Sequence, residues 1–319
     1  MSAVIGRRVK VRVPATSANL GPGFDTLGLA LNLYDELIVE AVEPGTVRVD
    51  IDGVGAGEVP TDESNLVAKT VLETFDRLGQ QRPGIVITAK NRIPHGRGLG
   101  SSGAAIVAGI TAARGLLQGI SDVTDADVLR FATDIEGHPD NVAPGIFGGL
   151  TIAWVDESGP QHKQLAVHRG VSLLVCVPEA QMSTALARSL QPESVPHSDA
   201  VFNLSRSALL VAALVQSPEV LFPATEDRLH QTYRSAAMPE TSALIAELRA
   251  AGHAAVVSGA GPSVLVLSSD PAERLAAAEL VQERHGGAWK TLLLAVDIKG
   301  ATVEPFPHGT EASPGPGTL

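Results

Sequence analysis

The sequence predicts an α+β fold divided into two domains. Its 319 residues exceed what one core of ordinary size requires. Short apolar runs that alternate like strands are interleaved with longer segments whose apolar residues recur at helical spacing. Two of the short runs flank a glycine turn, which is typical of an α+β sandwich. We expect domains over residues 1–160 and 161–304, and a disordered tail rich in Pro, Gly, Ser and Thr over residues 305–319.

Composition narrows the class of protein. The hydrophobic fraction of 44% is ample for folding, and the aromatic fraction of only 3% means that the core must be built from Val, Leu, Ile and Ala. The net charge of −11 without a basic block argues against a nucleic-acid partner. No run of about 18 apolar residues is present, so we expect no membrane span and a cytoplasmic protein. The lone Cys176 lies in an apolar run and is expected in the core.

The first elements follow from apolar spacing. Small residues over 15–28 predict a long loop, and Ser64 is a plausible N-cap for the helix that follows. The expected elements are a strand over 8–13, a two-stranded hairpin over 29–42, a strand over 46–51 and a helix over 65–78.

A glycine-rich loop separates a strand over residues 84–89 from a helix over 104–117. Glycines let the backbone approach an anion closely, and the first N–H groups of a helix lack internal partners. Ser101 and Ser102 stand at the expected cap position. The loop lacks the lysine of a Walker P-loop and the spacing of a Rossmann fingerprint. Taken alone, it fits a serine-capped turn as well as a phosphate site.

The rest of the chain alternates between helices and strands. A helix over residues 125–137 is expected to stop at Gly137, with a loop over 140–145 and a strand over 147–155 after it. The later elements are strands over 171–177, 254–257, 264–267 and 290–296 and helices over 184–190, 199–216, 242–251 and 271–285.

Three stretches, over residues 13–25, 94–105 and 258–263, resemble in order and spacing the three motifs of the GHMP small-molecule kinases. The first is similar to that of the homoserine kinases in particular. Residues 136–141, 183–188 and 227–234 match as well, so the resemblance spans roughly residues 8–300. It implies an N-terminal domain like the second domain of ribosomal protein S5, a ferredoxin-like C-terminal domain and an active site between them.

The resemblance implies a reaction and its cofactors. The γ-phosphoryl group of ATP would pass to the hydroxyl of L-homoserine, a step of threonine biosynthesis, in an enzyme that is a homodimer. Mg²⁺ would be held by Ser102 and Glu136, although Glu136 also fits a solvated charge at a helix end. The turn over 258–263 would brace the phosphate loop. That loop would bind ATP through Pro94, His95, Gly96, Arg97, Gly98, Leu99, Gly100, Ser101, Ser102, Gly103 and Ala104.

The same resemblance places residues around the substrate. Arg188 and Arg234 match a carboxylate clamp, which suits the donor fork of arginine. Thr184 would contact the γ-phosphate, and Asn65 is a weaker candidate for the adenosine site. The amino and hydroxyl groups would be met by Asn19, Asp25, His138 and Asn141.

The proton acceptor stays open at this stage. Asn141 stands where mevalonate kinase and galactokinase relatives carry an aspartate, and an amide accepts no proton at neutral pH. Either Asp25 takes the hydroxyl proton or no base operates, and a loose transition state favours the second. His138 also fits a purely structural histidine. The rival functions are a kinase for a related hydroxyl substrate and a non-catalytic binding member.

Overall fold

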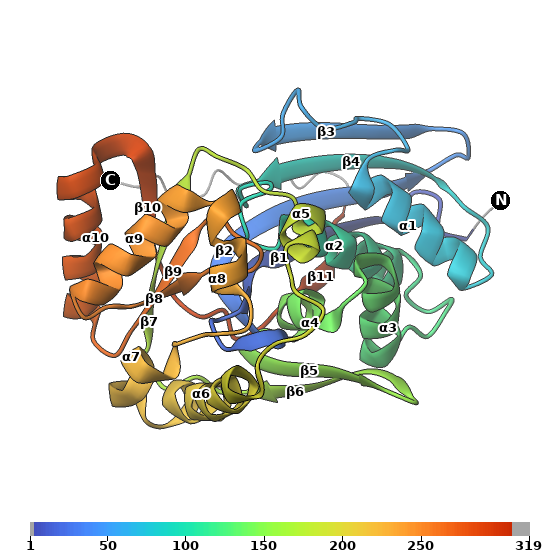
Figure 1. The fold of residues 1–319 in the computed structure, drawn as a ribbon. Helices are drawn as coiled ribbons and strands as arrows, with labels where there is room; N and C mark the ends of the chain where they lie inside the picture. The colour runs from blue at the N-terminus through green and yellow to red at the C-terminus, as the bar shows by residue number, and fades with distance from the viewer. Residues whose placement is uncertain (1–2, 308–319) are drawn as a thin grey trace.

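The computed structural model describes residues 3–307, and two β-sheets organise it (Figure 1). The strands are β1 (Arg8–Asn19), β2 (Gly23–Val42), β3 (Val47–Gly53), β4 (Gly84–Asn91), β5 (Leu150–Asp156), β6 (Gly159–Leu165), β7 (Ser172–Pro178), β8 (Ala254–Val257), β9 (Val264–Ser268), β10 (Trp289–Leu294) and β11 (Thr302–Pro305). A seven-stranded sheet has the order β11-β1-β2-β4-β3, with β5 paired to β2 and β6 to β5. A four-stranded sheet has the order β10-β7-β9-β8.

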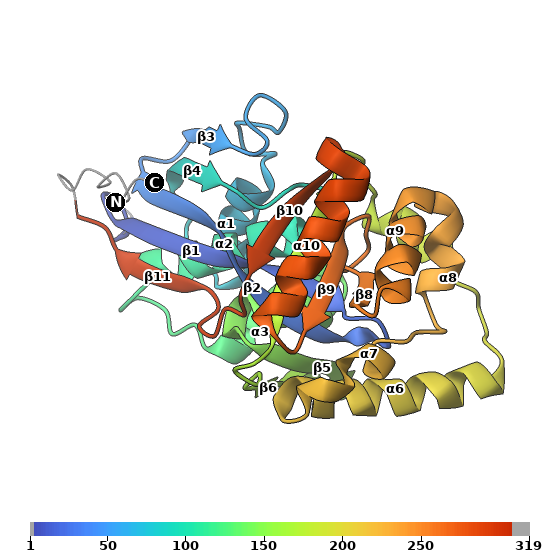
Figure 2. The same cartoon turned by 90° about the vertical axis from the view of Figure 1, so that its left-hand side faces the viewer.

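Helices cover both sheets. They are α1 (Leu66–Arg77), α2 (Ser101–Leu116), α3 (Asp125–Glu136), α4 (Pro139–Phe147), α5 (Thr184–Ser189), α6 (His197–Val215), α7 (Leu221–Ala224), α8 (Gln231–Arg234), α9 (Pro239–Ala250) and α10 (Pro271–His285). Helix α2 is buried along most of its length and packs against β1, α1, α3 and α4. Helix α10 lies across the four-stranded sheet (Figure 2). One hydrophobic cluster includes residues of both sheets, such as Val11 and Val175, so the two layers share a core.

The predicted loop over residues 15–28 and hairpin over 29–42 are wrong. Strand β1 continues to Asn19, and β2 is one strand of 20 residues. The alternation fails because β2 changes partners, pairing with β5 at residues 27–29 and with β4 at residues 36–42. Its residues 27–31 are buried on both faces, which removes the period of two.

Helix α4 replaces the expected loop over 140–145 and the start of the expected strand at residue 147. It begins with Pro139 at its first position and contains Pro144 and Gly145, a composition that is typical of loops.

The predicted helix caps also need correction. The N-cap of α1 is Asn65, whose side chain accepts from the N–H of Val67 at 3.0 Å, and not Ser64. The residue before α2 is Gly100, so neither Ser101 nor Ser102 is its cap.

Other expectations hold. Helix α3 ends at Gly137 in a left-handed conformation, α10 has the predicted bounds, and Cys176 is fully buried. The predicted division at residue 160 falls inside β6, which belongs to the larger sheet, so the domain boundary stays a prediction. Pro305 lies in β11 and pairs with Val9, contrary to the expected disorder, while residues 308–319 of that tail lie outside the described residues.

Within residues 3–307, one helix is long and apolar enough, by length and composition, to cross a membrane. This helix is α6, of which 22% is buried. It carries Asp199, Asn203 and Arg206. A single helix of this kind is weak evidence for a membrane span.

Candidate active site

One cavity of about 230 Å³ gathers side chains from six separate parts of the chain. It lies where the β1–β2 turn, the glycine loop, the α3–α4 junction, α5, α8 and the turn over 258–263 meet. Its lining is Ala18, Asn19, Asp25, Gly96, Arg97, Gly98, Gly100, Ser101, Ser102, Glu136, His138, Asp140, Asn141, Met182, Ser183, Thr184, Arg188, Arg234, Gly259 and Ala260. Most of the predicted site residues are therefore brought together, in a cavity whose lining residues Asn19 and Gly259 are 240 positions apart in the sequence.

The glycine loop is shaped by positive φ angles and by close neighbours. The φ values of Gly96, Gly98 and Gly100 are 64°, 70° and 69°. A Cβ on Gly98 would lie 2.1 Å from the carbonyl oxygen of Ser258, and one on Gly100 would lie 2.0 Å from Thr16 Oγ1. Only glycine fits both requirements, so the backbone stays open toward the cavity at the start of α2.

The turn over residues 258–263 supports this loop. Ser258 Oγ donates to the carbonyl of Gly98 at 2.7 Å, and the N–H of Gly259 donates to the carbonyl of Ala18 at 3.1 Å. The turn thus braces the loop, as the resemblance implied.

Several predicted loop residues do not face the first cavity. Leu99 is fully buried in the core, and Pro94 and Gly103 line neither cavity described here. The side chain of Arg97 donates to the carbonyls of Pro178 and Glu179, so it anchors the loop to the end of β7.

A second cavity of about 290 Å³ adjoins the first. Ser101 and Ser102 line both cavities, and His95 and Ala104 line the second. Asn65 lies at its wall, but its amide is committed to capping α1 and to the carbonyl of Pro60 at 2.9 Å. Most of the other lining residues are apolar, and three are polar. The apolar ones are Val13, Leu37, Val59, Pro60, Leu66, Val67, Ala105 and Ala108, and the polar ones are Asp35, Ser64 and Asn91.

Ser102 and Glu136 lie together at the start of α2 and the end of α3. Ser102 Oγ donates to Glu136 Oε2 at 3.1 Å. Burial raises the pKa of Glu136, while the charge of His138 and the hydrogen bond from Ser102 oppose that rise. No group of three or more His, Cys, Asp or Glu side chains that could hold a metal occurs among residues 3–307.

His138 and Asp140 form a tight pair at the start of α4. His138 Nδ1 lies 2.5 Å from Asp140 Oδ1, and Asp140 is 1% exposed. Burial alone lowers the pKa of His138, but the hydrogen bond and negative charge of Asp140 outweigh burial, so the pKa is raised. The ring therefore tends to carry a positive charge beside the cavity.

Asp25 is held by two partners, Arg188 at its carboxylate and Asn19 at its N–H group. Both of its carboxylate oxygens accept from Arg188, at 2.9 and 3.2 Å, in a bidentate pair between the β1–β2 region and α5. Its N–H donates to Asn19 Oδ1 at 3.0 Å, and Asn19 Nδ2 donates to the carbonyl of Gly259 at 2.9 Å. Asp25 and Asn19 have φ values of 52° and 71°, which are costly for residues with a Cβ and mark a strained turn.

Arg234 reaches the cavity from a buried position. It is 2% exposed, and its Nε donates to the carbonyl of Ala187 at 3.2 Å. Burial lowers the pKa of its guanidinium, and the charge of Asp25 opposes that effect. Thr184 is the first residue of α5 and also lines the cavity.

Asn141 is oriented by Thr16. Thr16 Oγ1 donates to Asn141 Oδ1 at 2.7 Å, which leaves the amide nitrogen of Asn141 as a donor. Sequence reasoning missed Thr16, and it missed Asp140 although this residue lies two positions after His138. It also missed His230, a buried neighbour of Arg234, because no periodic pattern marks a helix of four residues.

Comparison with known proteins identifies the family. The family model described as "GHMP kinases N terminal domain" matches residues 65–149, and the model described as "GHMP kinases C terminal" matches residues 210–286. A homoserine kinase of Clavibacter michiganensis subsp. michiganensis is 68% identical over 305 residues, which cover 96% of each chain. The chain belongs to the homoserine kinases, a family of GHMP kinases. A homoserine kinase of Streptomyces avermitilis is 49% identical over 93% of this chain and 96% of its own.

Solved structures agree with this family. The crystal structure of homoserine kinase from Cytophaga hutchinsonii matches with a TM-score of 0.79 and 28% identity, over 93% of this chain and 98% of its own. A mevalonate kinase of L. major shares the fold, with a TM-score of 0.69 and 18% identity over 93% of this chain and 98% of its own. The predicted fold and family are confirmed, and the chain is an ATP-dependent kinase.

Proposed function

We propose that the kinase transfers the γ-phosphoryl group of ATP to the hydroxyl of L-homoserine in the first cavity. The observation that carries this proposal is the position of Ser101 and Ser102, which line both cavities. A nucleotide with its adenosine in the second cavity would place its phosphates at the start of α2. Its terminal phosphate would then face Asp25, Arg188 and Arg234 across the first cavity.

The backbone N–H groups of the glycine loop and of the first turn of α2 would bind the phosphates. Thr184, at the start of α5, would donate to the γ-phosphate from the opposite side. This division of labour needs little covalent chemistry from the protein, because phosphoryl transfer depends mainly on alignment and charge neutralisation.

The residues present also fit a Mg²⁺ ion. Ser102 and Glu136 offer a hydroxyl and a carboxylate within 3.1 Å of each other. Mg²⁺ prefers oxygen ligands, and in phosphate-transfer sites it takes only one or two from the protein. When bound, the ion would neutralise charge on the phosphates, and Glu136 would hold it beside the glycine loop.

The cavity is suited to a zwitterion. Arg188 and Arg234 are cations for a carboxylate, whereas Asp25 and Asp140 are anions for an ammonium group. An ammonium group would add a further partner to two carboxylates that already pair with Arg188 and His138, and a hydroxy acid without an amino group would lack that contact. Asn19, His138 and Asn141 supply the remaining polar groups around the amine and hydroxyl.

We favour transfer without a protein base. Both oxygens of Asp25 accept hydrogen bonds from Arg188, so this carboxylate is engaged in holding the clamp. Asn141 offers an amide that orients the hydroxyl. In a loose transition state the nucleophile need not be ionised early, so the phosphate itself would accept the proton.

ADP release tests the function. L-Homoserine, L-threonine, L-serine and mevalonate should be supplied separately with ATP and Mg²⁺, and we expect the highest kcat/KM with L-homoserine. Arg234→Ala should abolish that response. Arg206→Ala, which removes an equal charge from the surface pair with Glu226, is the matched control. If none of the four compounds leads to ADP release, the proposed kinase activity is excluded. If another compound gives the highest kcat/KM, that compound replaces L-homoserine as the proposed substrate.

We also propose that the kinase acts in the cytoplasm as a homodimer in threonine biosynthesis. The family supports the pathway, and the oligomeric state follows from the resemblance. Sedimentation velocity at micromolar concentration would give twice the chain mass of 33.0 kDa for a dimer, whereas a single species of 33.0 kDa would refute the dimer.

A further inference from the structure

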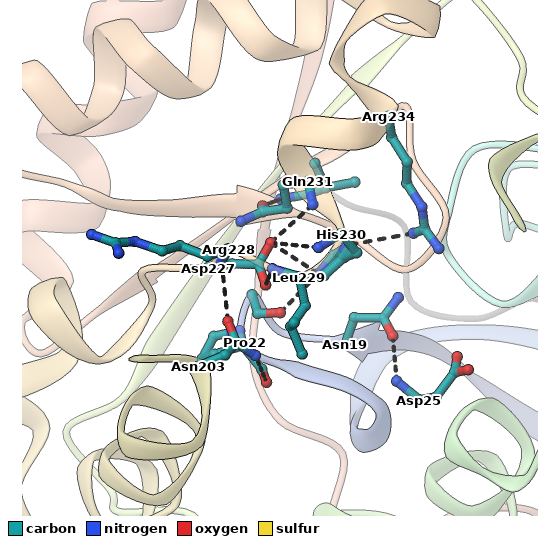
Figure 3. Close-up of polar contacts among 12 residues, drawn as sticks. Asn19, Pro22, Asp25, Asn203, Asp227, Arg228, Leu229, His230, Gln231 and Arg234 are labelled. Carbon is teal, nitrogen blue, oxygen red and sulfur yellow. Dashed lines mark hydrogen bonds and ion pairs between the residues drawn. The ribbon is translucent and has the colours of Figure 1, made fainter. Parts of the chain in front are cut away.

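A buried histidine connects the two halves of the substrate site. His230 is fully buried, and it precedes α8, whose last residue is Arg234. Its Nε2 lies 2.8 Å from the carbonyl oxygen of Gly21, in the turn between β1 and β2. Its Nδ1 lies 3.4 Å from a terminal nitrogen of the Arg234 guanidinium (Figure 3).

These two contacts define the state of the ring. A carbonyl oxygen only accepts, so Nε2 must carry the hydrogen. A guanidinium only donates, so Nδ1 must present its lone pair to Arg234. The neutral ring with hydrogen on Nε2 satisfies both partners, whereas a protonated ring would place an N–H group against another donor.

The surroundings agree with a neutral ring. Burial lowers the pKa of His230. The charged groups that face it are Asp227, Asp25 and Arg234, and the Asp227 carboxylate lies 3.8 Å from Nε2. The Phe24 ring stacks on the imidazole at a centroid distance of 5.1 Å.

The segment that carries His230 is itself held firmly. The Asp227 carboxylate accepts from the N–H groups of residues 229, 230 and 231 at 3.0, 3.1 and 2.8 Å (Figure 3). Gln231 Oε1 accepts from the N–H of Val257 at 2.7 Å, directly before the turn over 258–263. Asn203 bridges the same segment to the β1–β2 turn, accepting from the N–H of Arg228 and donating to the carbonyl of Pro22.

We propose that His230 is a positioning residue that acts in two directions. Through Nδ1 it orients the guanidinium of Arg234 toward the substrate carboxylate. Through Nε2 and Gly21 it fixes the turn that presents Asn19 and Asp25. This inference rests on the proposed function, because it requires Arg234 to bind the substrate.

Two substitutions separate the two contacts. The amide of asparagine lies near the position of ring Nδ1, so His230→Asn keeps an acceptor for Arg234 and loses the bond to Gly21. Glutamine reaches the position of Nε2, so His230→Gln keeps the donor to Gly21 and loses the acceptor for Arg234. Each variant therefore removes one direction of the proposed action.

The expected kinetics differ between the variants. His230→Gln should raise the KM for L-homoserine about 10-fold or more, with kcat and the KM for ATP changed less than about 3-fold. His230→Asn should lower kcat about 3- to 10-fold and change the KM for L-homoserine less. His253→Gln, a substitution at a half-exposed histidine outside both cavities, is the matched control and should change neither constant.

The outcomes distinguish three cases. Equal losses in both variants, spread over all constants, would show a merely structural role and overturn the inference. Unchanged kinetics in folded His230→Gln would overturn it as well. If the unsubstituted kinase releases no ADP with L-homoserine, the proposed function fails first and the inference falls with it.

A spectroscopic measurement covers the case in which the variants do not fold. Long-range ¹H–¹⁵N NMR on the unsubstituted kinase should show His230 neutral, with hydrogen on Nε2, above about pH 7, because burial lowers its pKa from the ordinary value of a histidine. A protonated ring, or hydrogen on Nδ1, would contradict the proposed contact with Arg234.

Discussion

The phosphate side and the substrate side of the site are built on different principles. The phosphate side is made of backbone: a loop with three glycines of positive φ, closed against Thr16 and Ser258 and continued by the buried helix α2. The substrate side is made of side chains on short helices, with Arg188 on α5 and Arg234 on α8. Backbone recognition tolerates almost no substitution, whereas side-chain recognition is tuned residue by residue, so the two sides should respond differently to mutation.

The largest effect should come from Gly100→Ala. The added Cβ would lie 2.0 Å from Thr16 Oγ1 and 3.0 Å from Asn141 Oδ1, at a φ of 69° that disfavours any Cβ. Displacement of the loop should cost about 10²- to 10³-fold in kcat/KM, the usual effect of losing a preorganised backbone donor. Steady-state kinetics with both substrates would measure it. A loss confined to the KM for L-homoserine would contradict the assignment of this loop to phosphate.

Arg234→Lys should act on the other side alone. Lysine keeps the charge but lacks the planar fork, and hydrogen bonds to charged groups are worth about 1.5–3 kcal/mol. We expect the KM for L-homoserine to rise about 10- to 100-fold while the KM for ATP stays within about 2-fold. Arg188→Lys should raise the KM for L-homoserine less, because Arg188 is 41% exposed and is already paired with Asp25. Equal increases of this KM in the two variants would contradict the expectation that the buried arginine contributes more to binding than the exposed one.

Asp25→Asn tests the role of the carboxylate that joins the two sides. The amide keeps the shape but loses the ion pair with Arg188. If Asp25 positions the clamp, turnover should fall about 10-fold, whereas loss of a general base should cost about 10²- to 10⁴-fold. Single-turnover measurement of the chemical step gives the answer. We expect the smaller loss. A rate of the chemical step that depends on pH in the wild type but not in Asp25→Asn would instead indicate that Asp25 is a general base.

The pair of His138 and Asp140 predicts a pH dependence. Asp140 raises the pKa of His138, so the cationic ring persists to a higher pH than an ordinary histidine and is lost as the pH rises through that raised pKa. His138 is assigned to the hydroxyl that would receive the γ-phosphoryl group, where a positive charge favours the transfer, so kcat/KM should fall on the alkaline side. Asp140→Asn removes the negative charge and should move this alkaline limb to lower pH. If the alkaline limb of the Asp140→Asn profile lies at the same pH as in the wild type, a group other than His138 is responsible for it.

The two sides also differ in how far the sequence predicts them. The glycine loop, Ser102 and Glu136 lie in contiguous motifs whose spacing carries the resemblance, and the structure places them around one cavity. The pairing of Arg188 with Asp25 joins residues 163 positions apart, which no local pattern reveals. Helix α8 is too short for periodicity, and α4 contains prolines and glycine that read as loop. The resemblance therefore predicts which residues gather on each side, whereas the contacts that hold the substrate-side residues are visible only in the structure.

Gly103→Ala should be the smallest change and the sharpest control for the phosphate side. Gly103 stands in the same helix start as Gly100, and a Cβ there would meet Val142 Cγ1 at 3.5 Å, an ordinary contact. Its φ is not positive, and the N–H group is retained. Because alanine loses less conformational freedom on folding than glycine, the variant should gain about 0.5–1 kcal/mol in free energy of unfolding. Urea unfolding would measure the gain, and kcat/KM should stay within about 2-fold, since the stability effect is not tied to the loop geometry. A large loss of activity here would mean that the phosphate side depends on space beside α2, and not only on the conformation of the three loop glycines.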